Sequence, residues 1–164
     1  MESDTTSWKK YEASARRVIY DLRRELGVSE VQDKQSLRGT SGVVWEIDGI
    51  AIPQGESGIL VIEARRHTTS GQKQEDLAAL AYRINDLAAL GGFIVTPLPL
   101  QKGAAMLAGR ENVIHIELTP DSDAENYVAK FLERVVIGAT LKSSFVISDT
   151  VTATVTRKKP ANDT

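Results

Sequence analysis

The sequence predicts an α/β fold, and three stretches of the chain carry this prediction. Two runs rich in Val and Ile, about 43–52 and 58–65, are joined by a turn that contains Pro and Gly, which is typical of a β-hairpin. An apolar stripe with helical spacing follows over 73–90, and a short apolar strand comes next over 93–96. A strand, a helix and a strand in this order indicate a right-handed crossover.

The remaining elements follow from periodicity and from capping residues. Apolar residues at spacings of three and four predict an amphipathic helix over 7–26, with Ser7 as its N-cap and Gly27 at its end. Segment 28–42 is polar and has room for a short edge strand. The order is completed by a helix over 100–110, a strand over 113–118, a helix over 124–138, a strand over 145–156 and a basic tail over 157–164 that is expected to be disordered.

Length and composition predict one domain over residues 1–156. The chain has 164 residues, of which 41% are hydrophobic and 26% are charged, as in ordinary globular proteins. A net charge of −2 argues against a general nucleic-acid-coating protein but permits a local phosphate-binding surface. The absence of cysteine excludes disulfides and thiolate metal sites. The polar N-terminus and the lack of a long apolar run predict a cytoplasmic protein without a membrane span.

Two acidic residues lie in otherwise apolar strands. Because strand side chains alternate, Glu46, Asp48 and Ile50 are expected to share one face of the first strand, and Glu63 and Arg65 one face of the second. Burying an acid is costly unless a partner neutralises it. Asp48 and Glu63 are expected to meet across the hairpin, where two carboxylates repel each other unless a cation lies between them. Mg²⁺ suits this position because it prefers carboxylate and phosphate oxygens.

These residues resemble the motif of the PD-(D/E)xK nuclease superfamily, which has the restriction-endonuclease-like fold. The resemblance is closest to the Mrr-like branch, in which a Gly-rich segment precedes the Asp and a helix with a Gln follows the Glu-x-Lys strand. Here these features are residues 39–42, Asp48, Glu63-Ala64-Arg65 and Gln74, within a similarity that spans roughly residues 8–118. The resemblance implies an αβββαβ core with a central mixed β-sheet flanked by helices, followed here by an extra C-terminal helix and strand.

The resemblance also implies a function and a site. It implies a homodimeric DNA endonuclease that hydrolyses phosphodiester bonds with Mg²⁺ or Mn²⁺. The ion is expected on Asp48, Glu63 and the backbone carbonyl of Ala64. Glu12 on the first helix is a possible further ligand, and Gln74 is expected to point into the site. For both, a structural role is open: Glu12 as a boundary glutamate, Gln74 as a core-edge glutamine bonded to backbone.

Arg65 occupies the position where the family has lysine. A guanidinium supplies charge and hydrogen-bond donors to a phosphate, but it cannot act as a general base because its pKa stays above about 12. Three outcomes are open. Arg65 is an electrostatic substitute, another lysine such as Lys73 has taken the role, or the chain has lost cleavage and is a DNA-binding or assembly module. A salt-bridged strand pair without metal is the structural alternative.

Overall fold

A computed structural model describes residues 2–66, 69–119, 127, 145–147 and 151–154. Its main sheet has seven strands in the order β1-β4-β5-β6-β7-β9-β8, and β2 and β3 form a separate two-stranded sheet. The strands are β1 (Val28–Gln32), β2 (Gln35–Arg38), β3 (Val44–Ile47), β4 (Gly49–Pro53), β5 (Leu60–Ala64), β6 (Gly91–Thr96), β7 (Val113–Glu117), β8 (Phe145–Ile147) and β9 (Val151–Thr154). The helices are α1 (Glu2–Asp21), α2 (Gln74–Asp86) and α3 (Lys102–Arg110).

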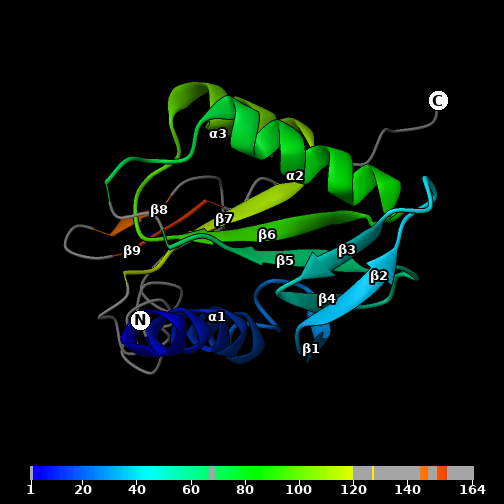
Figure 1. The fold of residues 1–164 in the computed structure, drawn as a ribbon, viewed down its shortest axis with the longest axis horizontal. Coiled ribbons are helices and arrows are strands. Elements are labelled where there is room, and N and C mark those ends of the chain that lie inside the picture. The colour runs from blue at the N-terminus through cyan, green and yellow to red at the C-terminus, as the bar shows by residue number, and fades with distance from the viewer. Residues whose placement is uncertain (1, 67–68, 120–126, 128–144, 148–150, 155–164) are drawn as a thin grey trace.

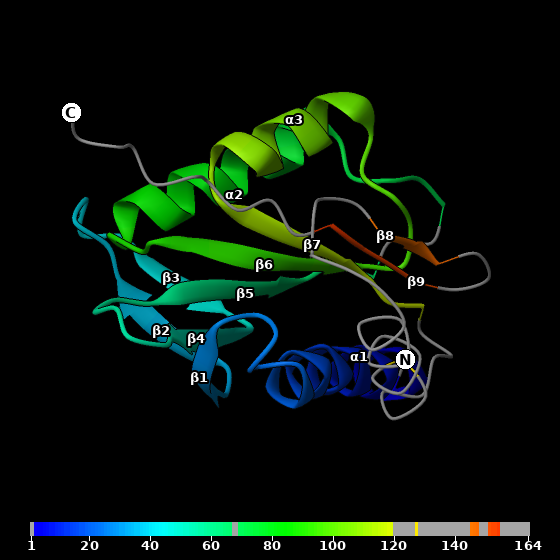
Figure 2. The same cartoon turned by 180° about the vertical axis from the view of Figure 1, so that it is seen from behind.

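Helices cover both faces of the main sheet. Figure 1 shows α2 and α3 on one face and α1 on the other, and Figure 2 shows the same layers from behind. Each face has its own core: Val18 and Ile19 of α1 pack with Ile62, whereas Leu77 and Leu80 of α2 belong to the opposite core. No helix in the described ranges is long and apolar enough to span a membrane.

The predicted crossover is confirmed. Strand β5 pairs in parallel with β6, and β6 with β7, whereas β4 pairs with β5 in the antiparallel direction. The result is the mixed α/β sheet, flanked by helices, that was expected. Alternation along β5 directs Ile62 and Ala64 into the α1 core and Val61 into the α2 core. Glu63 therefore lies on the α2 face of its strand.

The first predicted strand of the hairpin breaks at Asp48. Strand β3 pairs with β2 in the separate sheet, whereas β4 pairs with β5 in the main sheet. Gly49 follows the break, and the chain comes so close to Gln32 there that a Cβ atom would lie within 2.9 Å of the Gln32 carbonyl oxygen. The predicted common face of Glu46, Asp48 and Ile50 is therefore wrong, because alternation does not continue through the break; Glu46 is exposed and Ile50 is buried.

Several boundaries also differ from the predicted ones. Helix α1 starts before Ser7 and ends at Asp21, since the chain then turns back through Gly27, with φ +68°, to start β1. The predicted edge strand is confirmed as β1, and the predicted strand over 145–156 is two antiparallel strands, β8 and β9. The predicted helix 124–138, apart from the buried Tyr127, and the tail 157–164 lie outside the described residues.

Helix α2 ends at Asp86, earlier than predicted, and this residue fastens the β2–β3 sheet to the helix. Its carboxylate accepts hydrogen bonds from Trp45 Nε1 (2.7 Å), from the hydroxyl and backbone N–H of Ser41 (both 2.7 Å) and from the Thr40 hydroxyl (3.0 Å). A Cβ atom at Gly39 would clash with this carboxylate, so glycine is required there. These donors, led by Trp45 and Ser41, lower the pKa of Asp86 to about 2.

We expect Asp86→Ala to lower the melting temperature, because it removes four hydrogen bonds between α2 and the β2–β3 sheet with its connecting turn. The ordinary carboxyl pKa of 3.8 is depressed in the folded state to about 2. The Asp86 contribution is therefore complete above the ordinary pKa and is lost as the pH falls through the folded pKa. Melting curves between pH 7 and pH 2 should show the variant and the wild type converging at the acid end. The neighbouring exposed Asn85→Ala is the control, and a pH-independent difference would contradict the assignment.

Candidate functional site

Glu63 is held between two arginine side chains. It is only 6% exposed; its Oε1 forms an ion pair with Arg65 Nη2 at 2.7 Å, and its Oε2 accepts a hydrogen bond from Arg83 Nη1 at 2.5 Å. Arg65 follows two residues later on the same strand face, as predicted, and Arg83 comes from α2. The Arg83 guanidinium also lies over the Trp45 ring, with 5.3 Å between its carbon and the ring centroid. The two guanidinium groups offset part of the cost of burying Glu63, but burial outweighs them and keeps the pKa of this carboxyl above its ordinary value.

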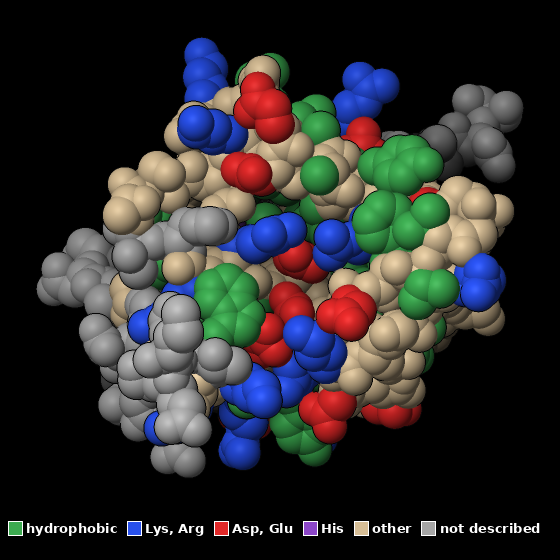
Figure 3. All heavy atoms as spheres, viewed as in Figure 1, with side chains coloured by type: hydrophobic (Ala, Val, Ile, Leu, Met, Phe, Trp, Pro, Cys, Tyr) green, Lys and Arg blue, Asp and Glu red, His purple; other side chains and the backbone are tan. Residues whose placement is uncertain are grey.

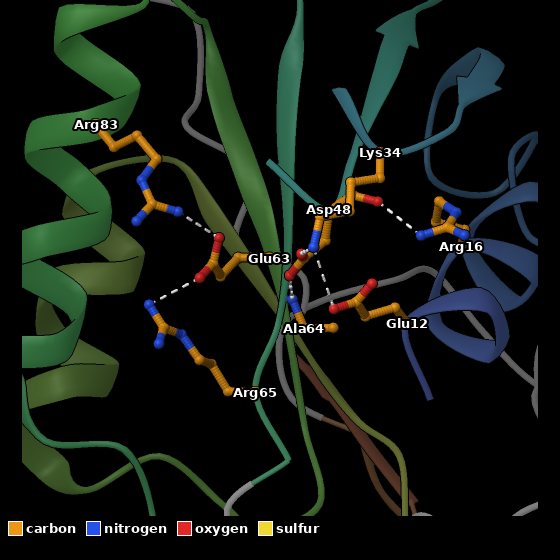
Figure 4. Close-up of polar contacts among 8 residues, drawn as sticks. All are labelled: Glu12, Arg16, Lys34, Asp48, Glu63, Ala64, Arg65 and Arg83. Atoms are coloured by element: carbon orange, nitrogen blue, oxygen red, sulfur yellow. Dashed lines mark hydrogen bonds and ion pairs between the residues drawn. The ribbon is translucent and has the colours of Figure 1, made fainter. Parts of the chain in front are cut away.

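Asp48 lies where the two sheets separate, beside Ala64. Its Oδ2 accepts the Ala64 backbone N–H at 2.9 Å, so a side chain takes over where the β4–β5 ladder ends. Its Oδ1 is 3.7 Å from Lys34 Nζ, and the same ammonium is 3.6 Å from Glu12 Oε1. Figure 4 shows Asp48 on the side of Lys34 and Glu12, whereas Glu63 points toward Arg65 and Arg83.

Helix α1 positions Glu12 through the packing of its neighbours. Tyr11 is buried and donates its hydroxyl to the Leu118 carbonyl at 2.8 Å, and Ala15 is fully buried. One turn after Glu12, Arg16 donates to the Asp48 carbonyl at 2.7 Å. Glu12, which is 5% exposed, is thereby brought to Lys34 in the same group as Asp48.

The cluster as a whole is electrically balanced. Three carboxylates face three cationic side chains, and the six residues, which we call the charged cluster, are Glu12, Asp48, Glu63, Lys34, Arg65 and Arg83. Burial raises the pKa of Glu63, the two arginines lower it, and the charge of Asp48 raises it again. The two acids are thus close enough to interact, although each is bound to different partners.

The donor chemistry suits a divalent ion, but the arrangement already neutralises it. Carboxylate and carbonyl oxygens from Asp48, Glu63 and Ala64 are the ligand types that Mg²⁺ prefers. Both Glu63 oxygens, however, are already ion-paired with guanidinium groups. Among the described residues, no three histidine or acidic side chains form a group arranged to hold a metal ion. The expected convergence of Asp48 and Glu63 on one ion is replaced here by separate pairing with cations of the chain.

The contacts that the structure gives for the other predicted site residues are with residues outside this cluster. Gln74 is exposed at the start of α2, lies against Gly103 of α3 and donates to Glu75 at 3.5 Å. Lys73 is exposed at the N-cap of the same helix. The lysine ammonium that lies within 4 Å of the acids, among the residues described, is that of Lys34.

Sequence reasoning missed Lys34 and Arg83 as members of the cluster. A signal for Arg83 exists, because it comes three residues after Leu80 and four before Leu87, which places a charge on the apolar stripe of α2. Such a charge needs a buried partner, and Glu63 provides it. Lys34 offers no comparable signal, since it stands in a polar segment without periodicity.

Comparison with known proteins shows a similar fold among solved structures. No family model and no curated protein matches the chain. Solved structures with a similar fold include the protein of unknown function AF1548, with a TM-score of 0.54 and 20% identity over 75% of this chain and 66% of that chain. A repair endonuclease from Pyrococcus abyssi also aligns with the chain, at a TM-score of 0.43 and 18% identity over 66% of this chain and 47% of that chain. The chain thus spans about two thirds of the first protein and under half of the second. At these identities the likeness to AF1548 shows a shared fold alone.

The two arginines on Glu63 are expected to differ in their contribution to stability. The Arg83 side chain is 17% exposed and that of Arg65 is 36% exposed. Removing a buried partner leaves an uncompensated charge, so Arg83→Met should lower the free energy of unfolding by about 3 kcal/mol. Arg65→Met should lower it by about 1 kcal/mol or less, because water can replace an exposed partner. Urea unfolding followed by circular dichroism measures both, and equal losses would contradict the unequal roles.

Proposed function

We propose that this protein is a metal-dependent DNA endonuclease of the restriction-endonuclease-like fold, with Arg65 in place of the usual lysine. The observation that carries the proposal is the charged cluster at the point where the two sheets separate. It combines oxygen ligands for a divalent ion with cationic groups for a phosphate. The Mrr-like motif order in the sequence and the mixed sheet flanked by helices support the same class.

The residues proposed to hold Mg²⁺ or Mn²⁺ are Asp48, Glu63 and the backbone carbonyl of Ala64, with Glu12 as an additional acid. A bound divalent ion supplies Lewis acidity toward the phosphate and lowers the pKa of a coordinated water. Asp48 is oriented for this role by the Ala64 N–H, which fixes one of its oxygens.

Arg65 is proposed to bind the scissile phosphate. Its guanidinium is more exposed than that of Arg83, and its planar donors match phosphate oxygens. When Arg65 turns from Glu63 to a phosphate, the Glu63 Oε1 atom loses its cationic partner and becomes available to a metal ion. Metal binding is then coupled to DNA binding. Lys34, 48% exposed beside Asp48, is proposed to provide the ammonium group that position 65 lacks.

A DNA-binding or assembly module without cleavage is the second candidate. The observation that favours it is the deep burial of Glu63 between two guanidinium groups, which pairs both of its oxygens with cations of the chain itself. This candidate predicts DNA binding that weakens with salt and does not depend on divalent ions.

A homodimer and a cytoplasmic location, both expected from the sequence, are part of the proposal for either candidate. Sedimentation measures whether the protein is a dimer.

Cleavage of plasmid, branched and single-stranded DNA in Mg²⁺ and in Mn²⁺ tests the proposed activity. We expect cleavage that EDTA abolishes. Metal ions supply several kcal/mol of transition-state stabilisation, so Glu63→Gln and Asp48→Asn should each lower the rate by about a hundredfold or more. The exposed Glu46→Gln, two residues before Asp48, is the matched control and should keep the wild-type rate. Cleavage that survives Glu63→Gln unchanged would remove the assignment.

Arg65→Lys separates the two candidates. If Arg65 is the working residue, this variant cleaves more slowly than the wild type, because lysine offers one donor group where the guanidinium offers a planar pair. If the chain is a decayed nuclease, the wild type is inactive and the variant gains cleavage.

Mn²⁺ binding, measured by the loss of the free-ion EPR signal, should rise when an uncleavable DNA is present. Equal Mn²⁺ binding with and without DNA would contradict the coupling.

A further inference from the structure

An aromatic surface adjoins the charged cluster. It consists of Trp45 from β3 and Tyr82 from α2, whose ring centroids are 6.2 Å apart at an interplanar angle of 69°. Tyr82 is 59% exposed, and the exposed Val43 and Val44 lie at the neighbouring end of the hairpin. Figure 3 shows hydrophobic side chains gathered beside the basic and acidic groups in the middle of this face.

Trp45 is held in a fixed orientation. Its Nε1 donates to Asp86 Oδ2 at 2.7 Å, and the Arg83 guanidinium lies over its ring. Arg83 also pairs with Glu63, so one side chain connects the aromatic surface to the candidate site. The aromatic surface is thus linked, through Arg83, to Glu63, which is also the ion-pair partner of Arg65.

We propose that Tyr82 and Trp45 form a stacking site for an unpaired nucleobase. Aromatic rings next to guanidinium groups are the combination that binds single-stranded nucleic acid, because every base has a π-face and every linkage a charge. A base inside a duplex does not offer its face, so the ligand class is DNA with single-stranded or branched segments.

This inference rests on the proposed function only in taking DNA as the ligand. The probes are a labelled thymidine oligonucleotide of about twelve nucleotides, an abasic oligonucleotide of equal length, and a duplex of equal length. All three carry phosphates, but only the first offers free bases. The wild type should bind the thymidine strand about tenfold or more tightly than the abasic strand, as expected for base–aromatic stacking.

Tyr82→Ala should remove this preference and leave the abasic affinity unchanged. Tyr82→Phe keeps the ring and should keep the preference. Tyr20→Ala removes another exposed tyrosine, 45% exposed on α1, and is the control for a general loss of tyrosine surface. In a Trp8→Phe background, quenching of Trp45 fluorescence by the thymidine strand but not by the abasic strand provides a second measurement.

The outcomes separate this inference from the proposed function. Preference for the thymidine strand without any cleavage supports the stacking site and fails the nuclease. Equal binding of thymidine and abasic strands overturns the stacking site, whether or not DNA is cleaved. Absence of binding to all three probes overturns both. If Tyr82→Ala instead converts a dimer to a monomer in light scattering and leaves the thymidine preference intact, the surface is a contact between copies and the inference is wrong.

Discussion

The hydrogen bond from the Ala64 backbone to the Asp48 carboxylate is the contact on which the site depends. It lies where β3 leaves for the small sheet and β4 begins in the main sheet, so the ladder cannot continue through it. A side-chain acceptor satisfies an N–H group that would otherwise be left without a strand partner. The same bond holds Asp48 next to Glu63, which brings an acid from the break of one strand beside an acid on its neighbour.

The balance of charge around these acids determines what the site binds. A site with three acids and one lysine would attract a divalent ion by itself, whereas the present cluster has a cation for each acid. An incoming ligand must therefore change the pairing, and an anion that recruits Arg65 does so at the most exposed guanidinium of the Glu63 pair. Under the proposed function, arginine at position 65 differs from the lysine of the resembled family in more than its donor group, because Arg65 is itself paired with Glu63, a proposed metal ligand.

The sequence predicts the main sheet well and the site only in part. Alternation in Val61-Ile62-Glu63-Ala64 is strict, so the face of Glu63 and its neighbour Arg65 was predictable. The break at Asp48 was not, because Val44 to Ile52 reads as one uninterrupted strand and the backbone crossing at Gly49 depends on Arg16 and Gln32, distant in sequence. The cationic partners Lys34 and Arg83 depend on packing between layers, which short-range patterns do not encode.

The hydrogen bonds of Asp86 connect the β2–β3 sheet to α2, and this connection links the aromatic surface to the charged cluster. The helix carries Tyr82 and Arg83, the β2–β3 sheet carries Trp45, and the four Asp86 hydrogen bonds join these two segments. If a ligand occupies the aromatic surface as proposed, its binding and the pairing of Arg83 with Glu63 are thermodynamically linked, and each favours or opposes the other by the same free energy.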